Sequence, residues 1–343
     1  MVVRHIGRFP PPYGGVSIKN KLLYDTISQY VPVKKLKQRR WMSKRIYEVL
    51  EILSSFLPNQ KLIIGISAST GKSKKYTQLL YLLARNNMKR SLYFMMGGTE
   101  ASRIAENDNE ISLYGNYKVI YVETISMLRK MRDVGMSNVE LFPNCRKKPG
   151  YEIIEDVSQE KLKCVFFSNI HPMKGVDTII ETASECPNID FYFYGEIDSK
   201  YMDDFLGQIN GYSNCTYMGV FKGKGDSLYK ELSKYDVLLL PTRYKTEGVP
   251  GVVVESKMAG IPSILSDVSH NRDLIEGEDG WILNSNSASE LIEILNTISQ
   301  DRSLLNNMKS AALASASNYD IQTYTNKILA SLGVSGNHNG GGY

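Results

Sequence analysis

Two glutamates separated by seven residues stand on either side of a predicted helix start. Glu247 opens the stretch EGVPGVVVESKMAGIP, and Glu255 lies about one turn inside the helix expected after Gly251. The free N–H groups and the dipole of a helix N-terminus favour an anion such as a diphosphate. A carboxylate beside it accepts hydrogen bonds from the vicinal hydroxyls of a sugar or ribose. Together these groups predict a sugar-nucleotide site, although such a glutamate pair alone is more often a solvated helix face.

A second stretch, LIIGISASTGKSKK at residues 62–75, is similar to a phosphate-binding P-loop but has the wrong spacing. Five residues separate Gly65 from Gly71, where a P-loop has four. A nucleotide-hydrolysing enzyme also needs a magnesium-binding aspartate after a buried strand, and VLLLPT ends in Thr242 instead. Two interpretations of Lys72 and Ser73 stay open: contact with an acceptor or another anion, or the plain start of a helix.

Length and composition indicate a two-domain protein of the cytoplasm. The 343 residues exceed one typical core, and 42% hydrophobic with 22% charged residues is ordinary for a folded domain. The N-terminus lacks the apolar segment of a signal peptide, and no apolar run is long enough to cross a bilayer. Four cysteines lie far apart without a CxxC pair, which predicts reduced thiols and no zinc site. No nucleic-acid-binding pattern is present.

The net charge of +5 is unevenly distributed. Residues 34–45, KKLKQRRWMSKR, contain seven basic residues and no acid. This segment is either a solvated loop with a first helical turn, or a patch for anionic lipid or a phosphate-rich acceptor. Apolar residues then follow at helical spacing and predict a buried helix face: Met42, Ile46, Val49, Leu50 and Leu53.

Short apolar runs alternate with amphipathic stretches along the whole chain. Such alternation predicts an α/β fold with parallel sheets covered by helices on both faces. Helices are expected at 175–186 and 287–300. The expected strands are 2–9, 61–67, 91–98, 118–123 and 139–144 in the first half, and 164–170, 190–196, 216–221, 236–242, 262–267 and 281–284 in the second.

A polar, charged segment at 143–163 marks the boundary between two Rossmann-like domains. We expect an N-terminal domain at 1–145, joined by a C-terminal helix near 318–332, and a C-terminal domain at 146–317. Residues 333–343, which end in SGNHNGGGY, are expected to be disordered.

Several segments around the two glutamates resemble the retaining glycosyltransferases of family four. SNIHPMKGVDTIIETA at 168–183, FYGE near Gly195, YMGVF near Gly219, LFPN at 141–144 and PPPYGGVSIKN at 10–20 are similar to the family's segments. The resemblance is strong over 141–285 and thinner before it. It implies the GT-B fold, in which two Rossmann-like domains face each other across a cleft.

The resemblance implies roles for individual residues. Glu247 would hold the transferred sugar and Lys174 the donor diphosphate, and these two would be the catalytic residues. Glu255 would bind the ribose hydroxyls. Further donor-binding positions would be Gly14, Gly15, Asn169, Gly195, Gly248, Val249, Pro250, Gly251 and Val252.

The chain departs from the family's pattern at two places. Asn169 stands where the family usually has a basic residue, so Arg243, Lys245 or Arg272 would have to supply the missing charge. The family also often has a histidine facing the sugar. Here His5 lies inside the first expected strand, and His171 lies in a loop beside the diphosphate segment.

The implied reaction is sugar transfer from a nucleotide diphosphosugar to an acceptor hydroxyl, with retention of configuration. Neither a metal nor another cofactor is expected, and the chain has no Asp-x-Asp motif; the adjacent acids of YMDDF at 201–205 fit a solvated helix. The acceptor would be a carbohydrate or a lipid-linked sugar in polysaccharide or glycolipid synthesis, at the inner face of the cell membrane. A sugar-nucleotide epimerase or hydrolase and an inactive nucleotide-sugar-binding partner are the alternatives.

Overall fold

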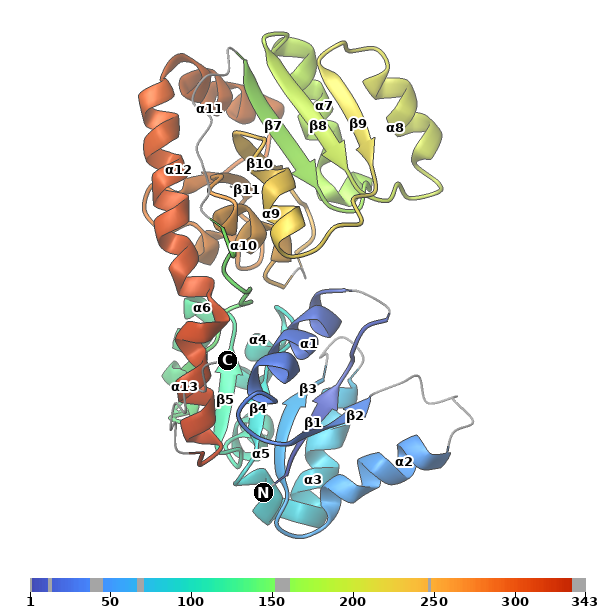
Figure 1. Cartoon of the computed structure of the whole chain (residues 1–343), viewed down its shortest axis with the longest axis vertical. Helices are drawn as coiled ribbons and strands as arrows, with labels where there is room; N and C mark the ends of the chain where they lie inside the picture. The colour runs from blue at the N-terminus through green and yellow to red at the C-terminus, as the bar shows by residue number, and fades with distance from the viewer. Residues whose placement is uncertain are drawn as a thin grey trace. The chain divides into compact units, whose positions relative to one another are not determined.

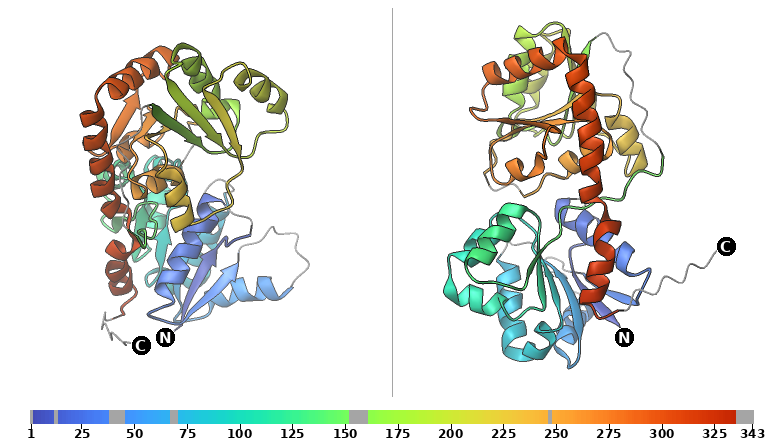
Figure 2. Two further views of the ribbon diagram at one scale, coloured as in Figure 1. Left: turned by 45° about the horizontal axis from the view of Figure 1, so that its top comes forward. Right: turned by 90° about the vertical axis from the view of Figure 1, so that its left-hand side faces the viewer.

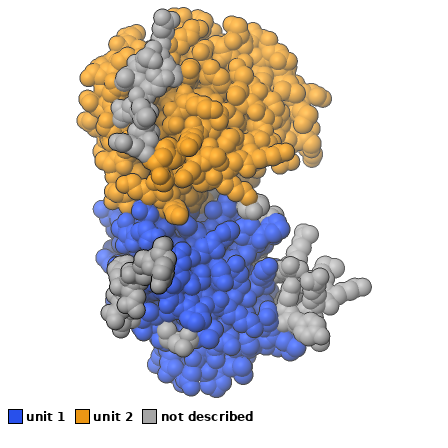
Figure 3. Space-filling model, in the orientation of Figure 1, with its two compact units in different colours: residues 1–145, 320–343 blue, residues 146–319 orange. Residues whose placement is uncertain are grey.

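The computed structural model describes residues 2–11, 14–37, 46–66, 71–151, 161–245 and 248–334. The chain separates into two compact units (Figures 1 and 3). Unit 1 is formed by residues 1–145 and 320–343, and unit 2 by residues 146–319. Each unit contains one six-stranded sheet.

The sheet of unit 1 has the strand order β2-β1-β3-β4-β5-β6, and its described strand pairs are parallel. The chain moves outward in one direction from β1 to β2 and in the other from β3 onward. In such a sheet ligands bind beyond the carboxyl ends of the strands where the order reverses, here β1 and β3. The strands are β1 (Val3–Gly7), β2 (Val33–Lys37), β3 (Lys61–Gly65), β4 (Leu92–Phe94), β5 (Val119–Val122) and β6 (Val139–Leu141).

Helices cover both faces of this sheet, as Figure 2 shows. Successive residues of β3 point to opposite faces, so Leu62 and Ile64 join one hydrophobic cluster and Ile63 joins the other. The first cluster includes residues of α3, α4 and α6, and the second includes residues of α1 and α13. The helices are α1 (Gly15–Ile27), α2 (Ile46–Leu53), α3 (Lys72–Met88), α4 (Glu100–Ala105), α5 (Asp108–Tyr114), α6 (Ile125–Asp133) and α13 (Ile321–Ser331), with the 3-10 turn η1 (Ser54–Phe56).

The C-terminal helix α13 completes the core of unit 1. Asp320 caps it by accepting from the N–H of Gln322, and Ile328 and Leu329 are buried in the cluster with α1. The Lys61 ammonium donates to the carbonyl of Leu332 at 2.7 Å. Unit 1 is therefore assembled from the two ends of the chain.

The sheet of unit 2 has the order β12-β11-β10-β7-β8-β9, again with parallel pairs. The order reverses between the neighbouring strands β7 and β10, so the loops after these two strands meet at one edge of the sheet. The strands are β7 (Leu162–Phe167), β8 (Ile189–Tyr194), β9 (Cys215–Gly219), β10 (Val237–Leu240), β11 (Ser263–Ser266) and β12 (Gly280–Leu283).

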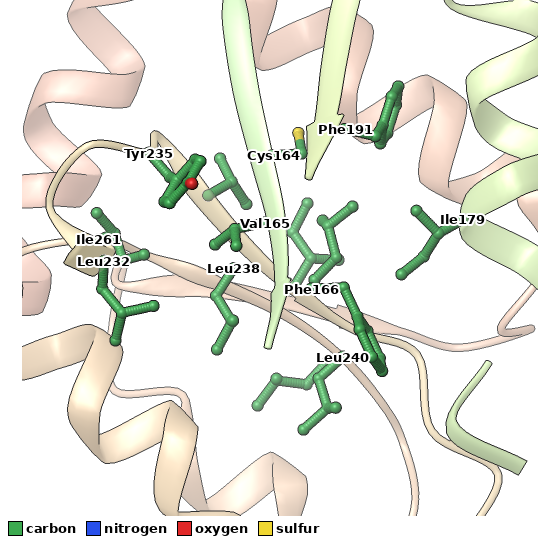
Figure 4. Packing of buried hydrophobic residues seen from close by; sticks show 14 of the residues in the cluster. Cys164, Val165, Phe166, Ile179, Phe191, Leu232, Tyr235, Leu238, Leu240 and Ile261 are labelled. Atoms are coloured by element: carbon green, nitrogen blue, oxygen red, sulfur yellow. The ribbon is translucent and has the colours of Figure 1, made fainter. Parts of the chain in front are cut away.

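The core of unit 2 lies on both faces of this sheet. Each residue of β10 is at most 1% exposed, as its uninterrupted apolar sequence predicts. Leu238 and Leu240 pack with Val165 and Phe166 of β7 (Figure 4). The helices are α7 (Val176–Glu185), α8 (Met202–Ile209), α9 (Asp226–Leu232), α10 (Gly251–Met258), α11 (Ala288–Gln300) and α12 (Arg302–Ala316), with 3-10 turns η3 (Pro172–Lys174), η4 (Asn271–Leu274) and η5 (Ser317–Tyr319).

The structure corrects two expectations for the region after Val33. All eleven expected strands are present, but β2 was missed, so residues 34–37 form an edge strand and not a loop. Lysines are tolerated there because the edge of a sheet faces solvent. The rest of the basic stretch, 38–45, lies outside the described residues. The predicted buried helix face is wrong for Leu50 and Leu53 of α2, which are 54% and 52% exposed.

Within the described part of the chain, no helix is both long and apolar enough to cross a membrane.

Candidate active site

The loops that follow β7 and β10 form one groove at the carboxyl edge of the unit 2 sheet. The groove has a volume of ≈ 650 Å³, and both Lys174 from η3 and Gly248 from the loop after β10 line it. Its other polar lining residues are Asn169, His171, Glu196, Asp198, Ser199 and Tyr244. The structure thus brings together a cation, an amide and the segment that leads into α10.

Lys174 is held in place by a short turn. His171 caps η3, its Nδ1 accepting from the N–H of Met173 at 3.1 Å. The Lys174 ammonium lies 5.6 Å from the centre of the Tyr244 ring, in a cation–π contact. Gly175 follows with φ at +75°, and a Cβ there would lie 2.0 Å from the carbonyl oxygen of Pro241. Only glycine lets the turn after β7 approach the end of β10 this closely.

Gly195 has an equivalent role at the end of β8. Its φ is +142°, and an added Cβ would lie 1.8 Å from the carbonyl oxygen of Ser168. The backbone N–H of Gly195 donates to Gly219 at 3.0 Å. The glycine therefore allows close packing of the strand ends beside Asn169, which is exposed in the groove.

Helix α10 begins directly after the loop that follows β10. Pro250 is its N-cap residue in an extended conformation, and the N–H groups of Gly251 and Val252 have no acceptor within the helix. Ser256 bonds to Ser263 at 2.8 Å, and the buried Lys257 ammonium pairs with Asp279. These contacts fix the helix against β11 and the residue that precedes β12. Val249 is buried at 7% exposure.

Glu255 has a partner that the sequence did not predict. The Nε of Arg146 donates to Oε1 of Glu255 at 2.8 Å, and the two side chains are only 8% and 16% exposed. The backbone N–H of Arg146 donates to the carbonyl of Tyr319 at 2.8 Å. Arg146 and Glu255 are 109 residues apart in sequence, and no local motif marks their contact. The carboxylate is thus oriented by a nearly buried cation.

Three cations were considered to supply the charge that Asn169 lacks, and two of them form ion pairs with aspartates. The guanidinium of Arg243 contacts both carboxylate oxygens of Asp177 at 2.8 Å and also donates to Thr178. The guanidinium of Arg272 pairs with Asp267 at 2.6 Å. Lys245 is exposed and has no ion pair with another described residue.

Glu247 lies outside the described residues, so its predicted position stays a prediction. Where the structure is described, no group of three histidine, cysteine, aspartate or glutamate side chains is placed to hold a metal ion. Asp203 and Asp204 are exposed on α8, as expected for a solvated helix.

The remaining predicted residues belong to unit 1. Gly14 and Gly15 follow β1 and begin α1, and a Cβ at either would have no atom within 4 Å. Lys72 is the first residue of α3. Ser73 is buried, and its hydroxyl donates to Glu100 at 3.0 Å. It therefore serves the packing of α3 in this structure and does not face solvent.

His5 is an interior residue of β1. It is fully buried, and its Nε2 bonds to Asn20 Oδ1 at 2.8 Å. Burial lowers the pKa of His5 to about 4, from an ordinary value of 6.5. The imidazole is accordingly neutral at physiological pH and is part of the unit 1 core.

The fold of the whole chain is similar to that of solved glycosyltransferases. HepE of Anabaena in complex with UDP is 14% identical, with a TM-score of 0.71 over 97% of this chain and 100% of that chain. Sucrose-phosphate synthase of Thermosynechococcus elongatus is 12% identical, with a TM-score of 0.68 over 96% and 97%. WaaG, described as a glycosyltransferase involved in lipopolysaccharide biosynthesis, is 13% identical, with a TM-score of 0.58 over 98% and 100%. The expected GT-B fold class is confirmed.

A comparison of the sequence with curated proteins gives no match. The family described as "Glycosyl transferases group 1" matches residues 152–314, which contain the groove, α7 and α10. Residues 152–314 of this chain are therefore similar to the glycosyl transferases group 1 family, and the chain has the GT-B fold.

Proposed function

We propose that this protein is a retaining glycosyltransferase that moves a sugar from a UDP-sugar to an acceptor hydroxyl. The observation that carries the proposal is the meeting of Lys174 and the segment leading into α10 at the switch point of the unit 2 sheet. This is where open α/β sheets bind ligands, and a helix N-terminus there suits a diphosphate. The choice of uridine is supported by HepE of Anabaena, whose structures contain UDP and UDP-glucose.

In the proposed reaction the leaving diphosphate gains negative charge. Lys174 and the N–H groups at the start of α10 stabilise that charge without reorganising during the reaction. Glu255 accepts hydrogen bonds from the ribose hydroxyls, and Glu247 positions the transferred sugar. The segment 248–252 offers backbone donors to sugar and phosphate. Lys245, which has no ion pair with a described residue, supplies the second cation in place of Asn169.

The acceptor is proposed to be a carbohydrate or a lipid-linked sugar, in the synthesis of a polysaccharide or glycolipid. The protein then works in the cytoplasm and at the inner face of the cell membrane. Support comes from the basic residues of 34–45, of which Lys34 and Lys37 are exposed on the edge strand β2. Basic residues of this kind are attracted to anionic lipid by about 1 kcal/mol each.

Thermal unfolding in the presence of nucleotides tests the proposal. UDP, GDP, ADP, ATP and their common sugar conjugates are compared, each with magnesium and with EDTA. A ligand at 100 times its dissociation constant stabilises its protein by about 2.7 kcal/mol. For a unit of this size, that corresponds to a shift of about 5 °C or more.

A shift with UDP that persists in EDTA and is lost in Glu255→Ala supports a metal-independent transferase. A shift with ATP and magnesium alone, unchanged in Glu255→Ala, overturns the proposal. Sugar release from a UDP-sugar without any acceptor identifies a hydrolase instead, and the absence of any nucleotide binding indicates an inactive homologue.

A further inference from the structure

Helix α3 of unit 1 exposes three leucines to solvent. Leu79, Leu82 and Leu83 are 49%, 75% and 65% exposed, while Leu80 and Met88 of the same helix are buried in the core. Leaving leucines in water is unfavourable, and contiguous exposed apolar residues usually mark a contact surface. We call the solvent-facing side chains of Lys75, Gln78, Leu79, Leu82 and Leu83 the α3 face.

The α3 face borders a shallow groove between α3 and α5. Leu79 and Leu82 line this groove together with Leu113 of α5 and Tyr81. Its volume is ≈ 680 Å³, and Lys75 lines it as well. The guanidinium of Arg85 lies 4.8 Å from the centre of the Tyr81 ring. The leucines thus form one apolar strip with cations beside it.

The charge of the helix is of one sign. Residues 72–90 contain six basic residues and no acid: Lys72, Lys74, Lys75, Arg85, Lys89 and Arg90. Lys74 pairs with Glu110 of α5 at 2.8 Å, and none of the other five has an ion pair with a described residue. Three of these cations precede the leucines in sequence and three follow them.

We propose that the α3 face docks on an anionic lipid surface. The leucines enter the boundary between head groups and acyl chains, and Lys75, Arg85, Lys89 and Arg90 contact lipid phosphates. An amphipathic helix with leucines on one side and basic residues around them lies in the plane of a membrane interface in this way. A protein partner fits the pattern less well, because lysines are depleted from the buried centre of protein–protein interfaces.

This inference rests on the proposed function and names a membrane contact on α3, in addition to the basic residues of 34–45. Binding is measured on the full chain without nucleotide or acceptor. A failure of lipid binding is therefore distinguishable from a failure of the proposed transfer, which the UDP titration reports separately.

The test is co-sedimentation of the full chain with vesicles of phosphatidylcholine, alone or mixed with phosphatidylglycerol. Leu82→Ser combined with Leu83→Ser removes the most exposed leucines, and Lys89→Gln combined with Arg90→Gln removes two cations. Leu50→Ser combined with Leu53→Ser is the matched control. It also replaces two half-exposed leucines by serine, but on α2, which follows the 34–45 segment in sequence. Unfolding temperatures verify that each variant is folded.

We expect the wild type to bind the anionic vesicles and the Leu82/Leu83 variant to bind them at least tenfold more weakly. Each cation removed should weaken binding roughly fivefold, since one basic residue near the surface contributes about 1 kcal/mol. The α2 control should bind as the wild type does.

Three results overturn the inference. The wild type fails to sediment with anionic vesicles, the Leu82/Leu83 variant binds as tightly as the wild type, or only the α2 control loses binding. Light scattering adds a fourth: if the wild type is a dimer that the Leu82/Leu83 substitutions convert to a monomer, a second copy of the chain covers the α3 face.

Discussion

Replacement of Arg146 by glutamine tests how the candidate site holds its ribose-binding carboxylate. In the structure, the Arg146 Nε lies 2.8 Å from Glu255 Oε1, and Tyr319 holds the Arg146 backbone. Arg146→Gln keeps a polar side chain but removes the charge and shortens the reach. Glu255 then loses the cation that fixes its rotamer, and we expect it to turn toward solvent.

The magnitude follows from the geometry. A hydrogen bond to a charged group contributes about 1.5 to 3 kcal/mol to stability. Because Glu255 is 16% exposed, water replaces part of the lost contact. We therefore expect Arg146→Gln to lower the free energy of unfolding by about 1 to 2 kcal/mol. For binding, a misplaced carboxylate should cost about 1.4 kcal/mol, roughly tenfold in affinity for UDP.

Calorimetric titration with UDP and 2′-deoxy-UDP separates positioning from general destabilisation. The wild type should prefer UDP, and Arg146→Gln should reduce that preference, because Glu255 acts on the ribose hydroxyls. Arg302→Gln is the matched control, since Arg302 pairs with Asp236 just before β10, at the opposite edge of the sheet. The reasoning is refuted if Arg146→Gln binds UDP with wild-type affinity and an unchanged preference for the ribonucleotide.

Three further predictions concern the diphosphate cation, the strand ends and the buried histidine. Lys174→Ala should weaken UDP binding roughly ten- to hundredfold in calorimetry and leave uridine binding unchanged, because the ammonium meets only the diphosphate; equal losses for both ligands would contradict this role. Gly195→Ala should lower the free energy of unfolding in urea by about 3 kcal/mol or more, because the added Cβ would lie 1.8 Å from the Ser168 carbonyl oxygen. Gly207→Ala is the control: an added Cβ there meets no atom within 4 Å, so this helical substitution in α8 should raise the free energy of unfolding slightly. Burial lowers the pKa of His5 to about 4 in the folded protein. As the pH falls below 6.5, this histidine is therefore protonated in the unfolded chain before it is protonated in the folded one. The free energy of unfolding should drop by about 2 kcal/mol from pH 7 to pH 5 as a result. His5→Gln should remove this drop from urea unfolding, and an identical pH dependence in both proteins would show that another group is responsible.

The sequence predicted the strands well because their apolar pattern is local. The uninterrupted VLLL of β10 can only be buried on both sides, and the structure buries all four residues. The edge strand β2 was missed because three of its five residues are lysines. Its strand conformation is set by pairing with β1, from Val3↔Val33 to Gly7↔Lys37, and not by a hydrophobic face of its own.

The candidate site was predictable where it depends on local spacing. The helix start at Gly251 with Glu255 one turn later follows from turn and helix signals, whereas Lys174 was predicted from the resemblance of its Lys-Gly segment to the family. The partners were not predictable, because Arg146 reaches Glu255 across 109 residues and Arg243 reaches Asp177 across 66. Such pairs depend on the order of strands in the sheet, which a single sequence does not state.

The groups proposed to bind the donor and those proposed to meet the membrane lie in different units. Lys174, Glu255 and Arg146 belong to unit 2, whereas α3 and its leucines belong to unit 1. Each unit has its own hydrophobic core, so a surface change in one should not disturb the other. We therefore expect Leu82→Ser with Leu83→Ser to keep wild-type affinity for UDP, and Arg146→Gln to keep wild-type binding to anionic vesicles. If either variant loses both properties, the two functions are coupled, and assigning each to a single unit is wrong.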